Sequence, residues 1–148
     1  HGLLKEPYRR PVYLDQPAGW LPGMDDDTGT MSSQFVYQAL GLYPACPGEP
    51  YFVIGSPVFE KVELTVGGGR IFTLEATGSS RKNRYIQSAT LNGKPLNRAW
   101  IWHDELWNGG NLVLEMGPEP NESWAADPGA APPSMSDGKA PEPIPYVY

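Results

Sequence analysis

The sequence predicts an α+β chain in which one amphipathic helix is followed by a small antiparallel β-sheet unit. Apolar residues recur at helical spacing in one segment, and six short runs after it are rich in β-branched and aromatic residues. Glycine and proline number 17 each in 148 residues, which disfavours a helical bundle. With 40% hydrophobic residues, the chain is long enough for one compact domain with its own core.

The chain opens with a lead-in that precedes the helix. Residues 1–24 carry four prolines and show neither a helical nor a strand period, so we expect an extended or looped segment there. From about 30 to 42, apolar residues return every three to five positions, which predicts the helix. Asp27 or Thr28 can cap its first turn, and Gly41 can end it.

Short alternating runs predict the strands of the sheet unit. They are residues 51–54, 61–66, 71–76, 85–91, 99–102 and 112–116. Gly67–Gly69 joins two of these runs, and Asn92–Gly93 suits a tight hairpin, because both central residues of such a turn take positive φ. We therefore divide the chain into three parts. These are a lead-in with an acidic loop and a helix (1–44), an antiparallel β-rich unit (45–123), and a Pro/Ala/Gly-rich arm or disordered tail (124–148).

The composition argues against several classes of function. The net charge is -6 and basic residues cluster only at Arg81, Lys82 and Arg84, which disfavours a nucleic-acid partner. No apolar run approaches the ~20 residues of a membrane-spanning helix, so a membrane partner is not expected. Cys46 is the single cysteine, which excludes an internal disulfide and a zinc site with several thiolates. A small buried hydrophobe is the favoured interpretation of Cys46.

Three consecutive carboxylates, Asp25, Asp26 and Asp27, form the densest chemical feature. Their mutual repulsion costs free energy unless a metal, a helix N-terminus or a shared proton offsets it. In an extended loop Asp25 and Asp27 face the same side, where a pair of carboxylates can polarise a water molecule as general base. Ordinary capping of the following helix is the alternative interpretation. A calcium loop of the EF-hand type is disfavoured, because no glutamate follows at the required distance.

The chain holds five tryptophans, and exposed tryptophans can stack on the apolar faces of sugars. For Trp100 and Trp102, which stand two apart on one predicted strand, core packing is the favoured interpretation. His103, Asp104 and Glu105 include the residue types of a catalytic or metal cluster. Neighbouring side chains at the end of a strand point apart, so a solvated turn is favoured for these three residues.

Several motifs follow one another between about residues 20 and 124. They are Leu21–Ser32 (LPGMDDDTGTMS), Ala39–Pro44 (ALGLYP), Pro47–Gly48, Ile54–Val62 (IGSPVFEKV), Tyr85–Ser88 (YIQS), Leu91–Pro95 (LNGKP), His103, Gly109–Gly110, Leu112, Met116–Gly117 and Pro120–Asn121. Together and in this order they resemble glycoside hydrolase family 92, the calcium-dependent exo-acting α-mannosidases. The resemblance is specific because it rests on several ordered motifs rather than on the acidic triplet alone.

The resemblance implies an inverting hydrolysis of terminal α-mannosides by a secreted or periplasmic enzyme. Such an enzyme combines an N-terminal β-sandwich with an (α/α)6 barrel, so the predicted helix would be the last helix of that barrel, with the antiparallel β-sheet unit packed after it. An acidic loop holds the general base in this family. Carried onto this sequence, the loop places Asp27 at its most characteristic position and Asp25 beside it as partner. Calcium is the cofactor that the resemblance implies.

The resemblance also implies partners outside this sequence. Inverting enzymes hold their acid and base carboxyls roughly 6.5 to 9.5 Å apart, which adjacent aspartates cannot supply across a sugar ring. The general-acid glutamate of the family lies upstream of the matched segment. We therefore expect a C-terminal part of a longer enzyme, with α-mannoside glycans and the upstream remainder as partners, and no turnover by this chain alone. Met24 replaces a usual glycine of the family, and Gln34–Phe35 replaces a usual Trp–Tyr pair.

Two other interpretations stay open. In the first, the chain is a non-catalytic β-rich carbohydrate-binding or interaction module, whose tryptophans bind glycan while the aspartates cap a helix. In the second, it belongs to a degenerate and inactive homologue. A part of an enzyme should differ from a binding module by exposing the apolar stripe of Met31, Phe35 and Leu40.

Overall fold

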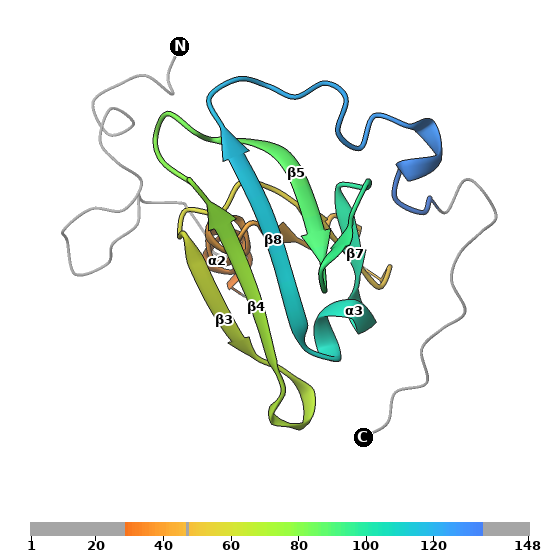
Figure 1. Ribbon diagram of the computed structural model, residues 1–148. Coiled ribbons are helices and arrows are strands. Elements are labelled where there is room, and N and C mark those ends of the chain that lie inside the picture. Colours follow the sequence, from red (N-terminus) through yellow and green to blue (C-terminus); the bar gives the residue numbers. More distant parts are fainter. Residues whose placement is uncertain (1–28, 47, 135–148) are drawn as a thin grey trace, which may run out of the picture. The chain divides into compact units, whose positions relative to one another are not determined.

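The computed structural model describes residues 29–46 and 48–134 of the chain (Figure 1). The predicted site residues Asp25 and Asp27, the lead-in of residues 1–24 and residues 135–148 lie outside the described residues. The elements are, in chain order, α2 (Thr30–Leu40), β1 (Leu42–Tyr43), β2 (Tyr51–Ile54), β3 (Lys61–Thr65), η3 (Gly67–Gly69), β4 (Ile71–Thr77), β5 (Tyr85–Leu91), β6 (Lys94–Pro95), β7 (Trp100–Trp102), α3 (His103–Trp107), β8 (Gly110–Gly117) and η4 (Pro128–Ala130).

The strands form two sheets. β1, β2 and β7 form an antiparallel three-stranded sheet in the order β1-β2-β7. The other five strands form a second sheet in the order β3-β4-β8-β5-β6, which Figure 1 shows toward the viewer with β8 at its centre. This second sheet is mixed, because β4 and β8 run parallel, with Phe72 opposite Gly110 at one end and Thr77 opposite Glu115 at the other.

The predicted fold class is wrong. The sequence predicts an α+β chain with the last helix of an (α/α)6 barrel, whereas the described residues are mainly β-sheet, with α2 of 11 residues and α3 of five. No helical barrel is present in residues 29–46 and 48–134. Helical periodicity identifies a helix but not what it packs against, and strand alternation identifies two faces but not the order of strands. The prediction of a purely antiparallel sheet is also wrong, because strand alternation could not reveal that β4 pairs in parallel with β8.

Helix α2 is fastened at its C-terminal end. Gly41 ends it with φ 79°, a conformation that costs glycine nothing. The N–H of Gly55 donates to the carbonyl of Gly41 at 2.9 Å, and the N–H of Val58 donates to the carbonyl of Ala39 at 3.0 Å. A Cβ atom at Gly41 would stand 2.9 Å from the backbone nitrogen of Pro57, so this close approach also requires glycine.

One hydrophobic core lies between the two sheets. Alternate residues of β4 point into it, and Phe72 and Leu74 are almost completely buried there. Leu112 and Leu114 of β8 and Ile101 of β7 are also fully buried, so strands from both sheets contribute. Burial of a side chain of this size stabilises the fold by about 1.5 to 3 kcal/mol relative to exposure.

The predicted hairpin at Asn92–Gly93 is confirmed. Their φ angles are 51° and 75°, as a type I′ turn requires, and β5 pairs with β6 across it. The turn also fixes the start of β8, because Oδ1 of Asn92 accepts a hydrogen bond from the N–H of Asn111 at 2.9 Å. A Cβ atom at Gly110 would overlap the Asn92 side chain, so glycine is needed there.

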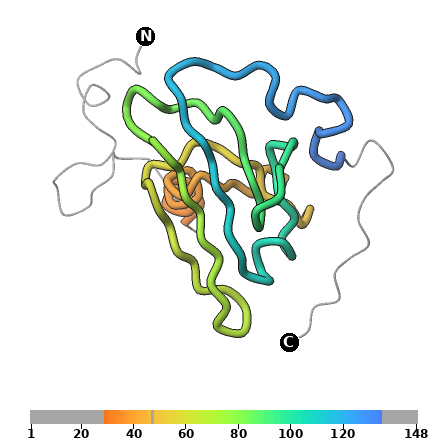
Figure 2. Tube along the Cα trace, in the orientation of Figure 1, coloured from red at the N-terminus to blue at the C-terminus, as the bar shows by residue number. Residues whose placement is uncertain are grey.

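Hydrogen bonds fasten the segment after β8 to neighbouring strands. Nδ2 of Asn121 donates to the carbonyl of Gln87, the residue at a register shift in β5, at 2.7 Å. Nε1 of Trp124 donates to the carbonyl of Leu96 at 2.9 Å. Figure 2 shows this segment in blue, leaving β8 and turning back. Among the described residues, no helix is long and apolar enough to cross a membrane.

Candidate functional site

The predicted catalytic aspartates, Asp25 and Asp27, lie outside the described residues, so the structure gives no geometry for them. Helix α2 begins at Thr30, three residues after Asp27 in the sequence. The described elements that follow the acidic loop in the sequence are joined by aromatic and polar contacts.

Four aromatic rings from three elements follow one another in space. The Tyr37 ring of α2 lies 6.3 Å from the Phe52 ring of β2, centroid to centroid. Phe52 stacks on His103 of α3 at 6.2 Å, and His103 stacks on Trp107 at 5.4 Å with 25° between the ring planes. We call Tyr37, Phe52, His103 and Trp107 the aromatic ladder. Pairs of Phe, Tyr and Trp rings add about 0.5 to 1.5 kcal/mol beyond the area they bury, which applies here to Tyr37 and Phe52.

The last ring of the ladder rests on a backbone without a side chain. A Cβ atom at Gly67 would overlap the indole of Trp107, so this ring lies directly against the glycine of η3. Nε of Arg70 donates to the carbonyl of Trp107 at 3.2 Å and fixes the end of α3 to the same turn. The ladder therefore runs from α2 to η3.

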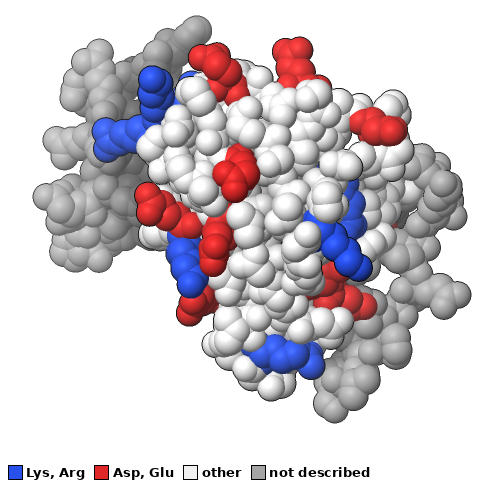
Figure 3. Space-filling view, viewed as in Figure 1, with Lys and Arg blue, Asp and Glu red and all other residues white. Residues whose placement is uncertain are grey.

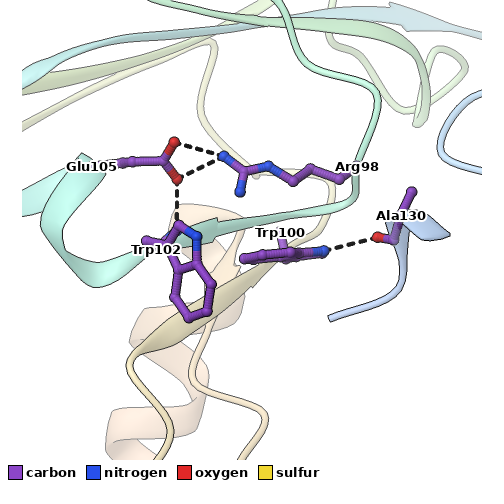
Figure 4. A network of polar contacts seen from close by, with 5 residues as sticks. All are labelled: Arg98, Trp100, Trp102, Glu105 and Ala130. Atoms are coloured by element: carbon purple, nitrogen blue, oxygen red, sulfur yellow. Dashed lines mark hydrogen bonds and ion pairs between the residues drawn. The ribbon is translucent and has the colours of Figure 1, made fainter. Parts of the chain in front are cut away.

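A polar network fixes the other end of α3 (Figure 4). Nη2 of Arg98 donates to both carboxylate oxygens of Glu105, at 2.6 and 2.7 Å. Oε2 of Glu105 also accepts from the N–H of Trp102 at 2.8 Å, so this glutamate caps the helix from its third position. The Arg98 guanidinium lies over the Trp100 ring at 4.4 Å, and Nε1 of Trp100 donates to the carbonyl of Ala130 at 2.8 Å.

The prediction of a solvated turn at His103–Glu105 is only partly right, because the side chains of His103 and Asp104 are 39% and 66% exposed but the backbone is helical. These residues begin helix α3, and the Glu105 side chain is 30% exposed and paired with Arg98. A local sequence pattern could not reveal this pairing, because Arg98 precedes β7 and Glu105 follows it. Nδ1 of His103 stands 3.7 Å from Oδ1 of Asp104, too far for a hydrogen bond.

The tryptophans have structural contacts that limit their use as sugar platforms. Trp100 is 8% exposed, so it is buried as predicted, although on the sheet face away from the hydrophobic core, and its indole N–H is already bonded. Trp102 packs edge-on against Trp100, with ring centroids 4.8 Å apart. Trp107 is 47% exposed, but His103 covers one of its sides and Gly67 lies against the ring as well. A stacked sugar needs an open ring face.

An open groove of about 640 Å³ adjoins the polar network. Its lining includes Lys94, Asn97, Arg98, Glu105, Asp127 and Ala130. Figure 3 shows acidic and basic side chains interspersed on the face turned toward the viewer.

Lys61 lies 3.0 Å from Glu63, whose hydrogen bond and charge raise the pKa of the Lys61 ammonium.

Comparison with family models shows to which protein family the chain belongs. The model of the glycosyl hydrolase family 92 catalytic domain matches residues 6–118. The chain belongs to glycosyl hydrolase family 92. The resemblance drawn from the ordered motifs is thus confirmed.

Similar proteins support the family assignment. A protein of Arthroderma benhamiae described as an uncharacterized secreted glycosidase is 40% identical over 121 residues, which cover 80% of this chain and 15% of that protein. The structure of a family GH92 inverting mannosidase from Bacteroides thetaiotaomicron matches with a TM-score of 0.72 and 38% identity, covering 84% of this chain and 17% of that one. The family glycosyl hydrolase ccman5 matches with a TM-score of 0.74 and 41% identity, covering 85% and 16%. The chain therefore spans less than a fifth of the length of these relatives.

The structure explains why several family 92 motifs use the residues they do. Asn92 and Gly110 lock the hairpin to β8, and Gly41 permits the close approach that ends α2. His103 is the third of the four rings of the aromatic ladder and stacks on both Phe52 and Trp107. Sequence reasoning did not predict the ladder, although Trp107 four residues after His103 is a helical spacing that brings two rings together.

Proposed function

We propose that the chain is the C-terminal part of an inverting exo-acting α-mannosidase of family 92, which hydrolyses terminal α-mannosides of glycans. The observation that carries the proposal is the family match over residues 6–118, which includes Asp25 and Asp27. A relative described as an inverting mannosidase supports the reaction type. In this proposal Asp27, with Asp25 as its partner, activates the attacking water as general base.

The proposal assigns the general acid to another part of the longer enzyme. An inverting reaction places water between the sugar and the base, so the acid and base carboxyls stand about 6.5 to 9.5 Å apart on opposite sides of the ring. Asp25 and Asp27 are too close in sequence to fill both roles. The isolated chain should therefore not turn over mannosides.

Exposed apolar side chains support a covering partner. Phe35 and Val36 of α2 are 67% and 53% exposed, and Val58 and Phe59 are 72% and 52% exposed. The hydrogen bond from Val58 to Ala39 brings the two pairs near each other. Clustered apolar residues of this kind mark surfaces that another protein surface covers. We assign this patch to the remainder of the mannosidase.

This assignment predicts self-association of the isolated chain. Phe35→Ser with Val58→Ser should shift it toward monomer in analytical ultracentrifugation, because the apolar area that joins copies is removed. Ile71→Ser is the matched control, since Ile71 is also exposed but lies on the five-stranded sheet. Equal effects of both changes would contradict a specific patch.

Calcium belongs to the proposal as a cofactor of the longer enzyme. Within residues 29–46 and 48–134, no group of three or more His, Cys, Asp or Glu side chains could hold a metal ion. The described residues therefore do not fit a calcium site, and the proposed roles of Asp25 and Asp27 involve no metal. A chelator should abolish activity of the longer enzyme and calcium should restore it. Full activity in chelator would remove calcium from the proposal.

A secreted or periplasmic location is also part of the proposal. It rests on the relative that is described as a secreted glycosidase. Cell fractionation of the source organism checks it. Recovery of the longer enzyme in the cytosol would contradict the location without touching the catalytic assignment.

The decisive experiment exchanges the base. Asp27→Asn in the longer enzyme should lower kcat by about 10²- to 10⁴-fold on an α-mannoside, because the amide cannot accept the water proton. Substrate affinity should be nearly unchanged. Asp104→Asn is the matched control, because its side chain is 66% exposed on α3. Near-parental activity of the Asp27 variant would contradict the proposed mechanism.

The binding-module alternative has less support from the contacts of Trp100 and Trp107. It predicts that the isolated chain binds mannoside with micromolar affinity and stays monomeric. Isothermal titration with a mannose oligosaccharide separates the two readings. Tight binding by a monomer would favour the module.

A further inference from the structure

The open groove beside the polar network takes no part in the reaction as proposed. Its lining comes from segments far apart in the sequence, namely the end of β5, β6 and the residues after it, helix α3, and the segment around η4. Its volume of about 640 Å³ lies within the range of roughly 300 to 1,000 Å³ that is typical of ligand pockets. The groove is therefore large enough to hold part of an extended molecule.

The polar network holds two sides of this groove in place (Figure 4). Nη2 of Arg98 donates to both carboxylate oxygens of Glu105, at 2.6 and 2.7 Å, and both residues line the groove. The Arg98 guanidinium lies over Trp100, whose indole N–H donates to the carbonyl of Ala130, a third lining residue. A lining that is already ordered loses little conformational entropy when a ligand binds.

Arg98 keeps hydrogen-bond donors that the fold does not use. A guanidinium has N–H donors on Nε, Nη1 and Nη2, and the bonds to Glu105 use only Nη2. Among residues 29–46 and 48–134, Nε and Nη1 of Arg98 have no hydrogen-bond partner. The side chain is only 21% exposed, so a ligand that supplies acceptor oxygens would satisfy donors with restricted access to water.

The exposed residues of the groove add further groups that are free to bind a ligand. The side chains of Lys94 and Asn97 are exposed and have no ion pair or hydrogen bond with any described residue. Asp127 uses Oδ1 to accept from the N–H of Gly129 at 2.7 Å, which leaves Oδ2 available. Pro95 supplies an exposed apolar surface. Donors, acceptors and an apolar surface therefore occur together in the groove.

The charges of the lining balance. The cations Lys94 and Arg98 are matched by the anions Glu105 and Asp127. Charge complementarity therefore favours neither an anionic nor a cationic ligand. Arg98 is already paired with Glu105, so its remaining donors suit neutral oxygen atoms. A sugar hydroxyl both donates and accepts, which matches a lining that offers both kinds of group.

We propose that this groove is a second glycan-binding site, which holds a neutral part of the mannoside glycan other than the sugar that is cleaved. The inference rests on the proposed function, because an exo-acting enzyme leaves the remainder of a branched glycan available for binding elsewhere. No aromatic side chain is among the described residues that line the groove, so binding there is weak, with about millimolar affinity. Weak binding at a second site still raises the effective concentration of a polymeric substrate.

The test uses the longer enzyme with two substitutions in the groove. Lys94→Ala with Asn97→Ala should raise KM for a branched mannan about fivefold and leave kcat unchanged, because the gain in effective concentration is lost. KM for a small chromogenic α-mannoside, which cannot reach two sites, should stay at its parental value. Lys82→Ala with Asn108→Ala is the matched control, since both residues are exposed and lie outside the groove lining.

Three results of this comparison would overturn the proposal. They are an unchanged KM for mannan, an equal rise of KM in the control pair, and a rise of KM for the small α-mannoside as well. Melting temperatures of both double variants show whether either pair of substitutions affects folding. A fall in the groove variant without a fall in the control would assign these side chains to stability rather than to glycan binding.

Binding without turnover is the second measurement. In electrophoresis through a gel that contains mannan, Asp27→Asn in the longer enzyme leaves the polymer intact. Adding the Lys94 and Asn97 substitutions to this variant should reduce its retardation, and adding the control pair should not. A gelatin hydrolysate is the competing probe. If the hydrolysate abolishes the retardation that depends on the groove while an oligomannoside does not, the groove binds peptide and the glycan inference is wrong.

The outcomes separate this inference from the proposed function. If the longer enzyme cleaves no α-mannoside, the proposed function fails, whereas retardation by mannan still tests the groove. If the longer enzyme cleaves α-mannosides and the groove variant matches its control on mannan, the proposed function stands and the second site alone is wrong.

Discussion

The two sheets differ in the residues on their outer faces. The five-stranded sheet has one apolar and one polar face, so Phe72 and Leu74 fill the core while Thr73 and Glu75 between them face outward. The three-stranded sheet carries aromatic residues on the side away from that core, where Tyr51 packs edge-on against Trp100 at 5.9 Å. The polar outer face of the five-stranded sheet can be exposed to water. The aromatic outer face of the three-stranded sheet can instead pack against other parts of the protein.

The two sheets therefore have different roles, since one forms the core and the other holds neighbouring elements. The five-stranded sheet supplies the core that any fold of this size needs. The three-stranded sheet supplies the contacts that hold α2, α3 and the segment around Ala130. The following predictions test that division of roles.

The largest effect is expected in the five-stranded sheet. Leu114→Ala should lower the free energy of unfolding by about 2 to 5 kcal/mol, because Leu114 is fully buried and a cavity remains. Val113→Ala is the matched control, since the next residue faces the other side and is only partly buried. Urea unfolding of the isolated chain measures both. Equal losses would mean that this sheet has no single core face.

The next effect concerns the Arg98–Glu105 pair that fixes the start of α3. Arg98→Ala should lower the free energy of unfolding by about 1 to 3 kcal/mol, because it leaves the partly buried Glu105 carboxylate without its cation. Glu105→Ala should cost more, since it also removes the acceptor of the Trp102 N–H. Thermal unfolding of both variants checks the order. A smaller loss in Glu105→Ala would show that the cap adds nothing.

A pH effect should appear in the three-stranded sheet. Burial, and then the charges of Cys46 and Glu49, raise the pKa of the Tyr51 phenol above its ordinary value of 10.0. The neutral phenol is favoured in the fold, so its contribution is complete below the pKa of the unfolded chain and is lost as pH rises through the folded pKa.

Tyr51→Phe should therefore flatten the alkaline fall in melting temperature. Tyr43→Phe is the control, because Tyr43 lies on the neighbouring strand β1 and is exposed. Thermal scans between neutral and strongly alkaline pH measure the slope. An unchanged slope in Tyr51→Phe would assign the alkaline loss to other groups.

The smallest effect is expected on the polar face. Lys61→Gln should leave the melting temperature unchanged, although Lys61 lies 3.0 Å from Glu63 and 3.9 Å from Glu75. Exposed pairs of this kind are screened by water and salt. A clear fall in melting temperature at low salt would show that this face contributes more than solubility.

The sequence allowed the strands to be located but not arranged. Tyr51–Ile54 and Tyr85–Leu91 have the predicted bounds, and the Asn92–Gly93 turn follows from the need for positive φ. Local patterns report which residues face a core, so they locate elements. The parallel pairing of β4 with β8 depends on residues far apart in the chain, which no local pattern contains.

The candidate site was predictable to a different extent. Asp25 and Asp27 stay predictions, because they lie outside the described residues. The ladder and the Arg98–Glu105 pair were missed, since each joins residues from separate elements through side-chain contacts. The predicted barrel helix was wrong because periodicity describes one face of α2 and says nothing about its neighbours.

The central place of β8 determines when the unit can be completed during synthesis. Among the strands of residues 29–46 and 48–134, β8 is the last to leave the ribosome, yet it lies between the β3–β4 hairpin and the β5–β6 hairpin in the sheet. Until Gly117 has emerged, the edges of β4 and β5 that pair with β8 are unpaired, and such edges can pair with other chains. A chain that stops before β8 therefore has the two hairpins of this sheet without the strand that joins them. Aggregation during translation is therefore most favoured before β8 has emerged.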